Sequence, residues 1–375
     1  MYTLHNFDRQ SFLRNYWQKS PVVLKQLLPD FDDPIDEHEL AGLAMEEDID
    51  ARIVRRSGDQ WHVAHGPFED FSAQCVDQWS LLVQGVDNLV PAARALLDAF
   101  TFLPVWRRED VMVSFAVPGA GVGPHLDQYD VFIVQGKGQR HWQVGGRGDY
   151  QEQTPHPALR QVSGFEPVID VVLSSGDVLY IPPGCPHAGQ AITDSMSFSV
   201  GCRAPSQADL FSALADHLID QCSTPRFADP NMPVRTFAGD LLSSEVDDLR
   251  QLMRARIDDP SFSQWLASHL SQPHREFAPS AHTSAEEVGQ WLDQKITFWP
   301  TLNPRFIRID AAPEEHNLWV NGMGFYCPED AMALVESFLS APHWQANSSL
   351  NTNNRLFFVQ FLTKLINAGF WDPEL

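Results

Sequence analysis

The sequence has 375 residues, enough for two or three domains, and its 43% hydrophobic and 20% charged content is that of an ordinary globular protein. Its 26 basic and 49 acidic residues give a formal charge of −23, which disfavours nucleic-acid backbones and favours a cationic partner, or serves solubility alone. The start lacks the basic and apolar segments of a signal peptide, and no apolar run suggests a membrane span, so we expect a cytoplasmic protein. The five cysteines form no Cys-x-x-Cys pair, so we expect neither a disulfide framework nor a zinc site.

The first hundred residues predict helices mixed with short strands. The spacing of apolar residues and the positions of Pro and Gly predict, in chain order, a helix over 7–19, a strand over 21–24, a helix over 40–45, a hairpin over 51–65 and a helix over 91–100 that begins with Pro91.

Residues 111–201 change to short β-rich runs separated by Gly and Pro. Strands are predicted over 111–117, 131–135, 139–144, 168–173, 178–181 and 196–200. Many short strands with frequent turns favour an antiparallel sandwich or barrel. The Gly-x-Gly pattern at 119–123 leads into Pro124 and a strand instead of a helix, so it does not predict a dinucleotide site.

Helical spacing returns after residue 205. Ser206 is expected to cap a helix, and further helices are predicted over 244–257 and 261–270, before a polar, Pro-containing linker over 271–284. The last part predicts a helix over 285–295, a hairpin of residues 306–309 and 318–320, and helices over 329–339 and 356–368. That order is compatible with a small winged-helix-like domain.

Two motifs in the β-rich region predict a metal centre. His125 and Asp127 are two residues apart, so in a strand both side chains point to one face. His187, which follows the stiff run Pro182-Pro183-Gly184, is the candidate third ligand. Two His and one carboxylate form the facial triad of non-haem Fe(II) oxygenases, which leaves positions open for a co-substrate and dioxygen. A lone His on a strand is more often a packed or solvated residue, so the combination carries the prediction.

Arg140 is the candidate anchor for a co-substrate. Fe(II) oxygenases that use 2-oxoglutarate need a cation for its distal carboxylate, and Arg is well suited to that carboxylate. Strand alternation puts Arg140 and Trp142 on one face and His141 on the other. Ser114, on the strand before the metal motif, can add a hydroxyl to the same carboxylate. A surface Arg on a hairpin and an ordinary strand Ser are the alternatives.

With these residues in view, the chain resembles the JmjC-type 2-oxoglutarate oxygenases. More narrowly, it is similar to the bacterial ribosomal oxygenases, which hydroxylate an arginine of a large-subunit ribosomal protein. The run FAVPGAGVGPHLDQYDVF at 115–132 is especially close to that group. The other matching motifs are FLRNYW (12–17), PVVLK (21–25), HLD (125–127), GQRHW (138–142) and GDVLYIPPGCPH (176–187).

The resemblance implies an α+β chain with three parts. These are a double-stranded β-helix (jelly-roll or cupin-like) catalytic domain over 1–206, a helical dimerisation region over 207–275 and a winged-helix-like domain over 276–375. It implies His125, Asp127 and His187 as catalytic Fe(II) ligands and Arg140 as the 2-oxoglutarate anchor, although many relatives carry Lys there. A homodimer is expected.

The expected reaction uses 2-oxoglutarate and O2 to hydroxylate the β-carbon of an arginine in a basic ribosomal protein. Gln128, Tyr129 and Asp130 directly follow the metal motif and are expected to line the substrate entrance. Asp130 is expected to pair with the substrate guanidinium. No direct contact with nucleic acid and no membrane association are expected.

Three other interpretations stay open. The same chemistry could act on another protein, an RNA base or a small molecule, although the acidic charge argues against RNA. A non-catalytic cupin-type binding protein would usually show His-x-His where this chain has His125 and Asp127. A cupin isomerase would not need a cation at the position of Arg140.

Overall fold

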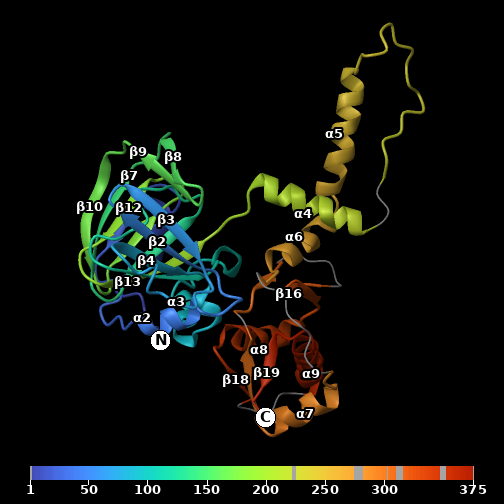
Figure 1. Cartoon of the computed structure of the whole chain (residues 1–375). Coiled ribbons are helices and arrows are strands. Elements are labelled where there is room, and N and C mark those ends of the chain that lie inside the picture. The colour runs from blue at the N-terminus through green and yellow to red at the C-terminus, as the bar shows by residue number, and fades with distance from the viewer. Residues whose placement is uncertain are drawn as a thin grey trace. The chain divides into compact units, whose positions relative to one another are not determined.

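The computed structural model describes residues 2–221, 225–273, 282–301, 303–309, 316–346 and 352–374. Part of the expected 271–284 linker, and Cys222, therefore lie outside the described residues. The chain divides into two compact units, Met1–Ala204 with Thr301–Asn303, and Pro205–Pro300 with Pro304–Leu375. In Figure 1 the first unit runs from blue to green and the second from yellow-green to red.

The first unit is built on antiparallel sheets, as the sequence predicts. The main sheet has eight strands in the order β1-β11-β6-β13-β5-β4-β2-β3, and a three-stranded sheet has the order β10-β7-β12. The main-sheet strands are β1 (Val22–Leu24), β2 (Ala51–Ser57), β3 (Gln60–His65), β4 (Gln78–Val83), β5 (Val111–Ala116), β6 (Asp130–Gln135), β11 (Val178–Ile181) and β13 (Ser195–Cys202). The others are β7 (Gln139–Gly145), β10 (Pro167–Ser174) and β12 (His187–Ala191), with β8 (Gln151–His156) and β9 (Leu159–Ser163) as a separate hairpin.

Both faces of the main sheet are covered, which explains its uninterrupted apolar runs. On β6, Phe132 and Val134 belong to the large core on the helical side. Their neighbours Val131 and Ile133 belong to a second core shared with residues of the three-stranded sheet, among them Val144. The space between the two sheets is therefore a packed interior, and residues of β7 and β12 that face it are held close to the main sheet.

Three helices cover the other face of the main sheet. They are α1 (Arg9–Asn15), α2 (Glu37–Leu43) and α3 (Pro91–Asp98), and two 3-10 turns, η1 (Val86–Asn88) and η2 (Val105–Arg107), lie on either side of α3 in the sequence. The Asp8 side chain caps α1, and Asp36 forms a capping box with Glu39 at the start of α2. Backbone N–H groups in the first turn of each helix are therefore hydrogen-bonded to a side chain. Phe12 of α1 makes an edge-to-face contact with Tyr180, with ring centroids 4.9 Å apart.

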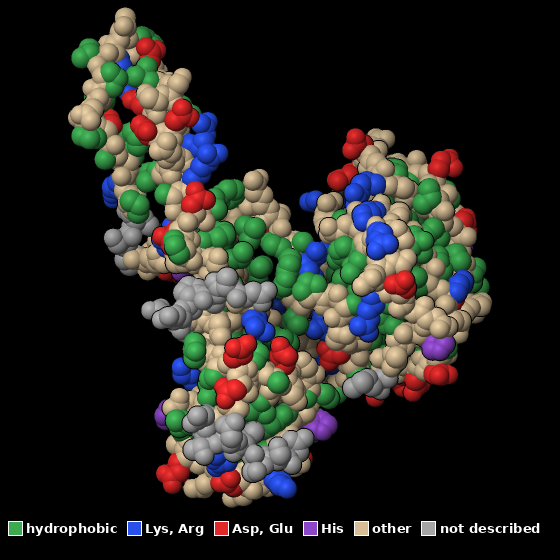
Figure 2. Space-filling view, turned by 180° about the vertical axis from the view of Figure 1, so that it is seen from behind, with side chains coloured by type: hydrophobic (Ala, Val, Ile, Leu, Met, Phe, Trp, Pro, Cys, Tyr) green, Lys and Arg blue, Asp and Glu red, His purple; other side chains and the backbone are tan. Residues whose placement is uncertain are grey.

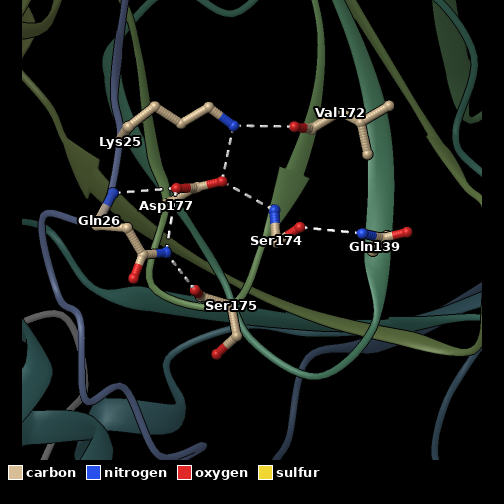
Figure 3. A network of polar contacts seen from close by, with 7 residues as sticks. All are labelled: Lys25, Gln26, Gln139, Val172, Ser174, Ser175 and Asp177. Atoms are coloured by element: carbon tan, nitrogen blue, oxygen red, sulfur yellow. Dashed lines mark hydrogen bonds and ion pairs between the residues drawn. The ribbon is translucent and has the colours of Figure 1, made fainter.

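A buried carboxylate fixes the N-terminal segment to the turn between β10 and β11 (Figure 3). Asp177 is 3% exposed and accepts from Lys25 Nζ at 2.8 Å and from the Gln26 and Ser174 N–H groups at 3.0 Å. The bonds from Lys25 and Gln26 join residues 152 and 151 positions apart in sequence. They hold β1 beside β11 and so extend the main sheet.

The second unit combines helices with two small sheets. Ser206 caps α4 (Gln207–Asp220) in a capping box with Asp209, and α5 (Ser243–Ile257) and α6 (Phe262–Leu270) follow. One core joins α7 (Ala285–Asp293), α8 (Glu329–Ser340) and α9 (Thr352–Asn367) to the sheet β18-β14-β19, made of Trp344–Gln345, Thr297–Pro300 and Trp371–Pro373. The second sheet is β15 (Phe306–Arg308), β16 (Leu318–Val320) and β17 (Met323–Phe325). Among the described residues, no helix combines the length and apolar character that crossing a membrane needs.

The structure differs from the sequence-based expectation mainly in short strands that the spacing of apolar residues does not predict. The expected helix over 7–19 is shorter, because the chain turns after Asn15 and Trp17 packs against Tyr180 instead. Strands β4, β8, β9, β12, β14, β17, β18 and β19 were not predicted. β12 carries one alanine and one glycine between its polar residues His187 and Gln190, so it lacks the usual apolar alternation.

Candidate active site

Two backbone segments bring His125 and His187 together. The two residues form an isolated antiparallel bridge in which each N–H donates to the carbonyl of the other at 3.0 Å. His187 is the first residue of β12, and Asp127 follows His125 in the loop before β6. The Asp127 carbonyl accepts from the Gly184 N–H at 3.1 Å, which fixes the loop against the Pro-rich approach to His187.

The three side chains converge on one point. One ligand-type atom from each of His125, Asp127 and His187 lies within 4.8 Å of the others. The Asp127 carboxylate is 3.9 Å from His125 Nε2 and 3.5 Å from His187 Nε2. His187 is buried and the other two are partly exposed, so the cluster opens to solvent on one side.

Both imidazoles are oriented by hydrogen bonds on their far nitrogens. His125 Nδ1 lies 3.0 Å from the Gly123 carbonyl and His187 Nδ1 lies 3.1 Å from the Cys185 carbonyl. A carbonyl only accepts, so each Nδ1 carries the proton and each Nε2 keeps its lone pair for a metal. Burial and the nearby His125 lower the pKa of His187 to about 4, which keeps this imidazole neutral near pH 7.

Arg140 crosses the interior from β7 to the main sheet. Its Nε donates to Ser195 Oγ at 2.9 Å, and Nη1 donates to Ser114 Oγ at 2.8 Å and Ser197 Oγ at 2.7 Å. Its Nη2 donates to the carbonyls of Ser114 and Ser195 at 3.0 Å. Ser114 is thus beside Arg140 as expected, whereas Ser195 and Ser197 were not predicted as its partners.

This guanidinium is buried without a counter-charge. Arg140 is 8% exposed, and none of the ion pairs found among the described residues includes it. Burial lowers its pKa to about 10, so it remains a cation at neutral pH. A buried cation held only by hydroxyls and carbonyls is poorly compensated, and an anionic ligand would supply the missing charge. The metal-type cluster and this cation together fit a chelating dicarboxylate.

The three residues after the metal motif differ from one another. Gln128 is exposed and Tyr129 is 39% exposed beside the cluster, and the partial burial of the Tyr129 ring, followed by the charge of Asp127, raises the pKa of Tyr129. Asp130 is 1% exposed and its carboxylate accepts from Tyr180, Gln18 and Arg107. The expected pairing of Asp130 with a substrate guanidinium therefore finds no support in the structure, because that carboxylate lies in the core on the helical side.

Comparison with known proteins extends this geometry. Residues 95–210 match the JmjC domain family. Over 369 residues, the chain is 40% identical to the ribosomal protein uL16 3-hydroxylase of Escherichia coli, covering 97% of each protein. The chain belongs to the JmjC-type ribosomal oxygenases. It is also 34% identical over 305 residues to a probable ribosomal oxygenase of Haemophilus influenzae, covering 76% of each.

Solved structures of a ribosomal oxygenase show the same fold. The X-ray structure of YcfD from Escherichia coli matches with a TM-score of 0.88 at 39% identity, covering all of both chains. YcfD in complex with cobalt and 2-oxoglutarate matches with a TM-score of 0.86 at 38% identity, again over the whole of both chains. The fold is therefore the JmjC, cupin-type oxygenase fold of mixed helices and sheets, as expected.

Proposed function

We propose that this ribosomal oxygenase is a 2-oxoglutarate- and Fe(II)-dependent dioxygenase that hydroxylates an arginine β-carbon of a large-subunit ribosomal protein. The observation that carries the chemistry is the His125–Asp127–His187 cluster in the same barrel as a buried, uncompensated Arg140. Its 40% identical relative is named for the 3-hydroxylation of ribosomal protein uL16, and position 3 of an amino acid is its β-carbon.

His125, Asp127 and His187 would hold the iron through two Nε2 atoms and one carboxylate. This donor set suits Fe(II), and both imidazoles already present the required nitrogen. When bound, iron supplies the open positions at which the co-substrate and O2 react. The overall reaction converts 2-oxoglutarate, O2 and a substrate C–H into succinate, CO2 and C–OH.

Arg140 and Ser114 bind the distal carboxylate of 2-oxoglutarate. Arg140 lies on β7, and its cross-strand neighbour on β12 is Ala191, four residues from His187. Ser114, Ser195 and Ser197 hold the guanidinium in place. An ion pair formed in this dry interior is stronger than one at the surface.

Gln128 and Tyr129 form part of the substrate entrance. Both are exposed next to Asp127, at the open side of the cluster. The formal charge of −23 attracts a basic ribosomal protein at long range and disfavours direct contact with nucleic acid. A substrate of this kind also places the enzyme in the cytoplasm.

The helical region over 207–275 serves homodimerisation. Val246, Leu249, Met253 and Ile257 recur at helical spacing on α5 and are 37%, 38%, 66% and 39% exposed. Figure 2 shows such hydrophobic side chains on the surface of this segment. Met253→Asp should convert a dimer to a monomer in light scattering, with the exposed Gln251→Asp on the opposite face of α5 as the control; an unchanged mass for Met253→Asp would exclude this surface.

The last part, over 276–375, is a winged-helix-like domain. In its support, α7, α8 and α9 share one core with the three-stranded sheet β18-β14-β19. Because the whole chain is acidic, this domain contacts protein and not DNA.

The decisive experiment is an intact-mass assay. Iron-loaded protein is incubated with 2-oxoglutarate and unmodified large-subunit ribosomal proteins. A gain of one oxygen on a single protein, dependent on 2-oxoglutarate, is expected, and peptide fragmentation should place it on an arginine side chain. Succinate production without any modified ribosomal protein would support the oxygenase activity and refute the proposed substrate. If neither appears, a non-catalytic binding protein is favoured.

A further inference from the structure

Trp142 lies on the inner face of β7 between the anion anchor and the metal cluster. Arg140, Trp142 and Val144 alternate as the buried residues of this strand. Their cross-strand neighbours on β12 are Ala191, Gly189 and His187, in the same order. A ligand that reaches from Arg140 toward His187 along this pair of strands therefore passes the indole of Trp142. The indole and the His187 ring are 6.2 Å apart between centroids.

The indole N–H of Trp142 has no partner. The side chain is 7% exposed, and Nε1 is buried without any hydrogen bond. Among the described residues, it is the only such buried side-chain atom on β7 or β12. Buried donors in folded proteins are nearly always paired, and an exception needs an explanation such as a ligand.

The backbone beneath the indole is shaped to hold it there. A Cβ on Gly189 would lie 2.7 Å from Cζ2 and Cη2 of Trp142, closer than atoms tolerate. Only glycine at this position of β12 lets the ring rest directly on the neighbouring strand. The register of β7 and β12 therefore sets the position of the ring. The same packing leaves the indole N–H without a partner.

We propose that Trp142 Nε1–H donates a hydrogen bond to a carboxylate oxygen of bound 2-oxoglutarate. This inference rests on the proposed function, since it needs the dicarboxylate to lie between Arg140 and the metal ligands. The contact satisfies the one unpaired donor in this row and adds a second recognition element to the charge of Arg140. Trp142 is in this sense a co-substrate-binding residue.

The test compares Trp142→Phe, which keeps an aromatic ring and removes the donor, with the wild-type full-length protein. Mn(II) replaces iron so that no turnover occurs, and 2-oxoglutarate is titrated by calorimetry. The dissociation constant should rise about tenfold or more, as expected for losing a hydrogen bond to a charged group. Trp61→Phe is the control, because Trp61 lies on the edge strand β3 against Arg56. An affinity within twofold of wild type for Trp142→Phe would refute the proposal.

Two further measurements separate this contact from a structural role. Without ligand, Trp142→Phe should lower the melting temperature only through the cavity that the smaller ring leaves in the buried cluster, because the N–H itself makes no bond in the free protein. With Zn(II) and 2-oxoglutarate, the ¹⁵N-indole signal missing from the variant should shift in the wild-type spectrum. A signal that does not move, although 2-oxoglutarate binds, overturns the inference and leaves the proposed function intact. A wild-type protein that binds no 2-oxoglutarate refutes both.

Discussion

Replacing Arg140 with Met should separate co-substrate binding from folding. Met fills much of the same volume but carries no charge. The variant loses five hydrogen bonds, worth about 1 kcal/mol each, from the ligand-free protein. It also removes the cost of burying the cation. Burial lowers the Arg140 pKa to about 10, and the shortfall from its ordinary value corresponds to roughly 3 kcal/mol. The net loss of unfolding free energy should be about 2 kcal/mol.

The effect on 2-oxoglutarate binding should be much larger. Removing one partner of a buried ion pair costs about 3–5 kcal/mol, which is a hundredfold or more in the dissociation constant. Urea denaturation of the free protein and calorimetric titration of the Mn(II)-loaded protein with 2-oxoglutarate measure the two quantities separately.

Two variants serve as references for this experiment. Arg140→Lys keeps the charge and should bind 2-oxoglutarate within about tenfold of wild type. Arg160→Met removes an exposed Arg on β9 and should change neither quantity. The reasoning fails if Arg140→Met binds 2-oxoglutarate within fivefold of wild type, since the distal carboxylate would then be held elsewhere.

Three other predictions concern carboxylates in the same unit. Asp127→Ala should abolish succinate formation and Mn(II) binding, and the free energy of unfolding should stay within about 1 kcal/mol of the wild-type value. Retained turnover would show that Asp127 is not a metal ligand. Asp130→Asn should lower the free energy of unfolding by about 3–5 kcal/mol, because it breaks the buried ion pair with Arg107. A loss of affinity for the substrate without a loss of stability would instead support a substrate-binding role for Asp130. Burial raises the pKa of Asp87 to about 7, well above its unfolded value, so its ionisation opposes folding and stability should fall as pH rises from about 4 to 7. Asp87→Asn should remove roughly 3 kcal/mol of that fall between pH 5 and 8 in urea titrations, whereas an unchanged pH profile would place the titration on another group.

The prediction of the metal centre rested on local patterns together with the resemblance to the JmjC-type oxygenases. The two-residue spacing of His125 and Asp127, and the Pro-rich approach to His187, are features that short stretches of chain impose by themselves. The structure brings the three side chains together, and their role as ligands remains a proposal. The antiparallel character of residues 111–201 is likewise visible in short apolar runs between turns, and it is confirmed by the strand pairing.

Residues that act through distant partners could not be assigned in this way. Ser195 and Ser197 meet Arg140 only because β13 and β7 face each other across the interior, more than 50 residues apart in sequence. No local signal distinguishes these two serines from other strand serines.

Asp130 shows the same limit from the opposite side. Its position three residues after Asp127 suggested the entrance, but the chain has by then entered β6. There Asp130 alternates with Val131 and shares the face of Phe132, which points to the helices and away from the metal cluster.

The sequence alone thus determined the kinds of residue and their local spacing: a His-x-Asp pair, a distant His and a strand-borne Arg. The tertiary structure alone decided which face each strand turns inward, how β7 and β12 pair, and that Trp142 keeps an unpaired N–H beside the anion anchor. The physical reason is that local spacing depends on backbone geometry within a few residues, whereas pairing register and burial depend on how the whole barrel closes.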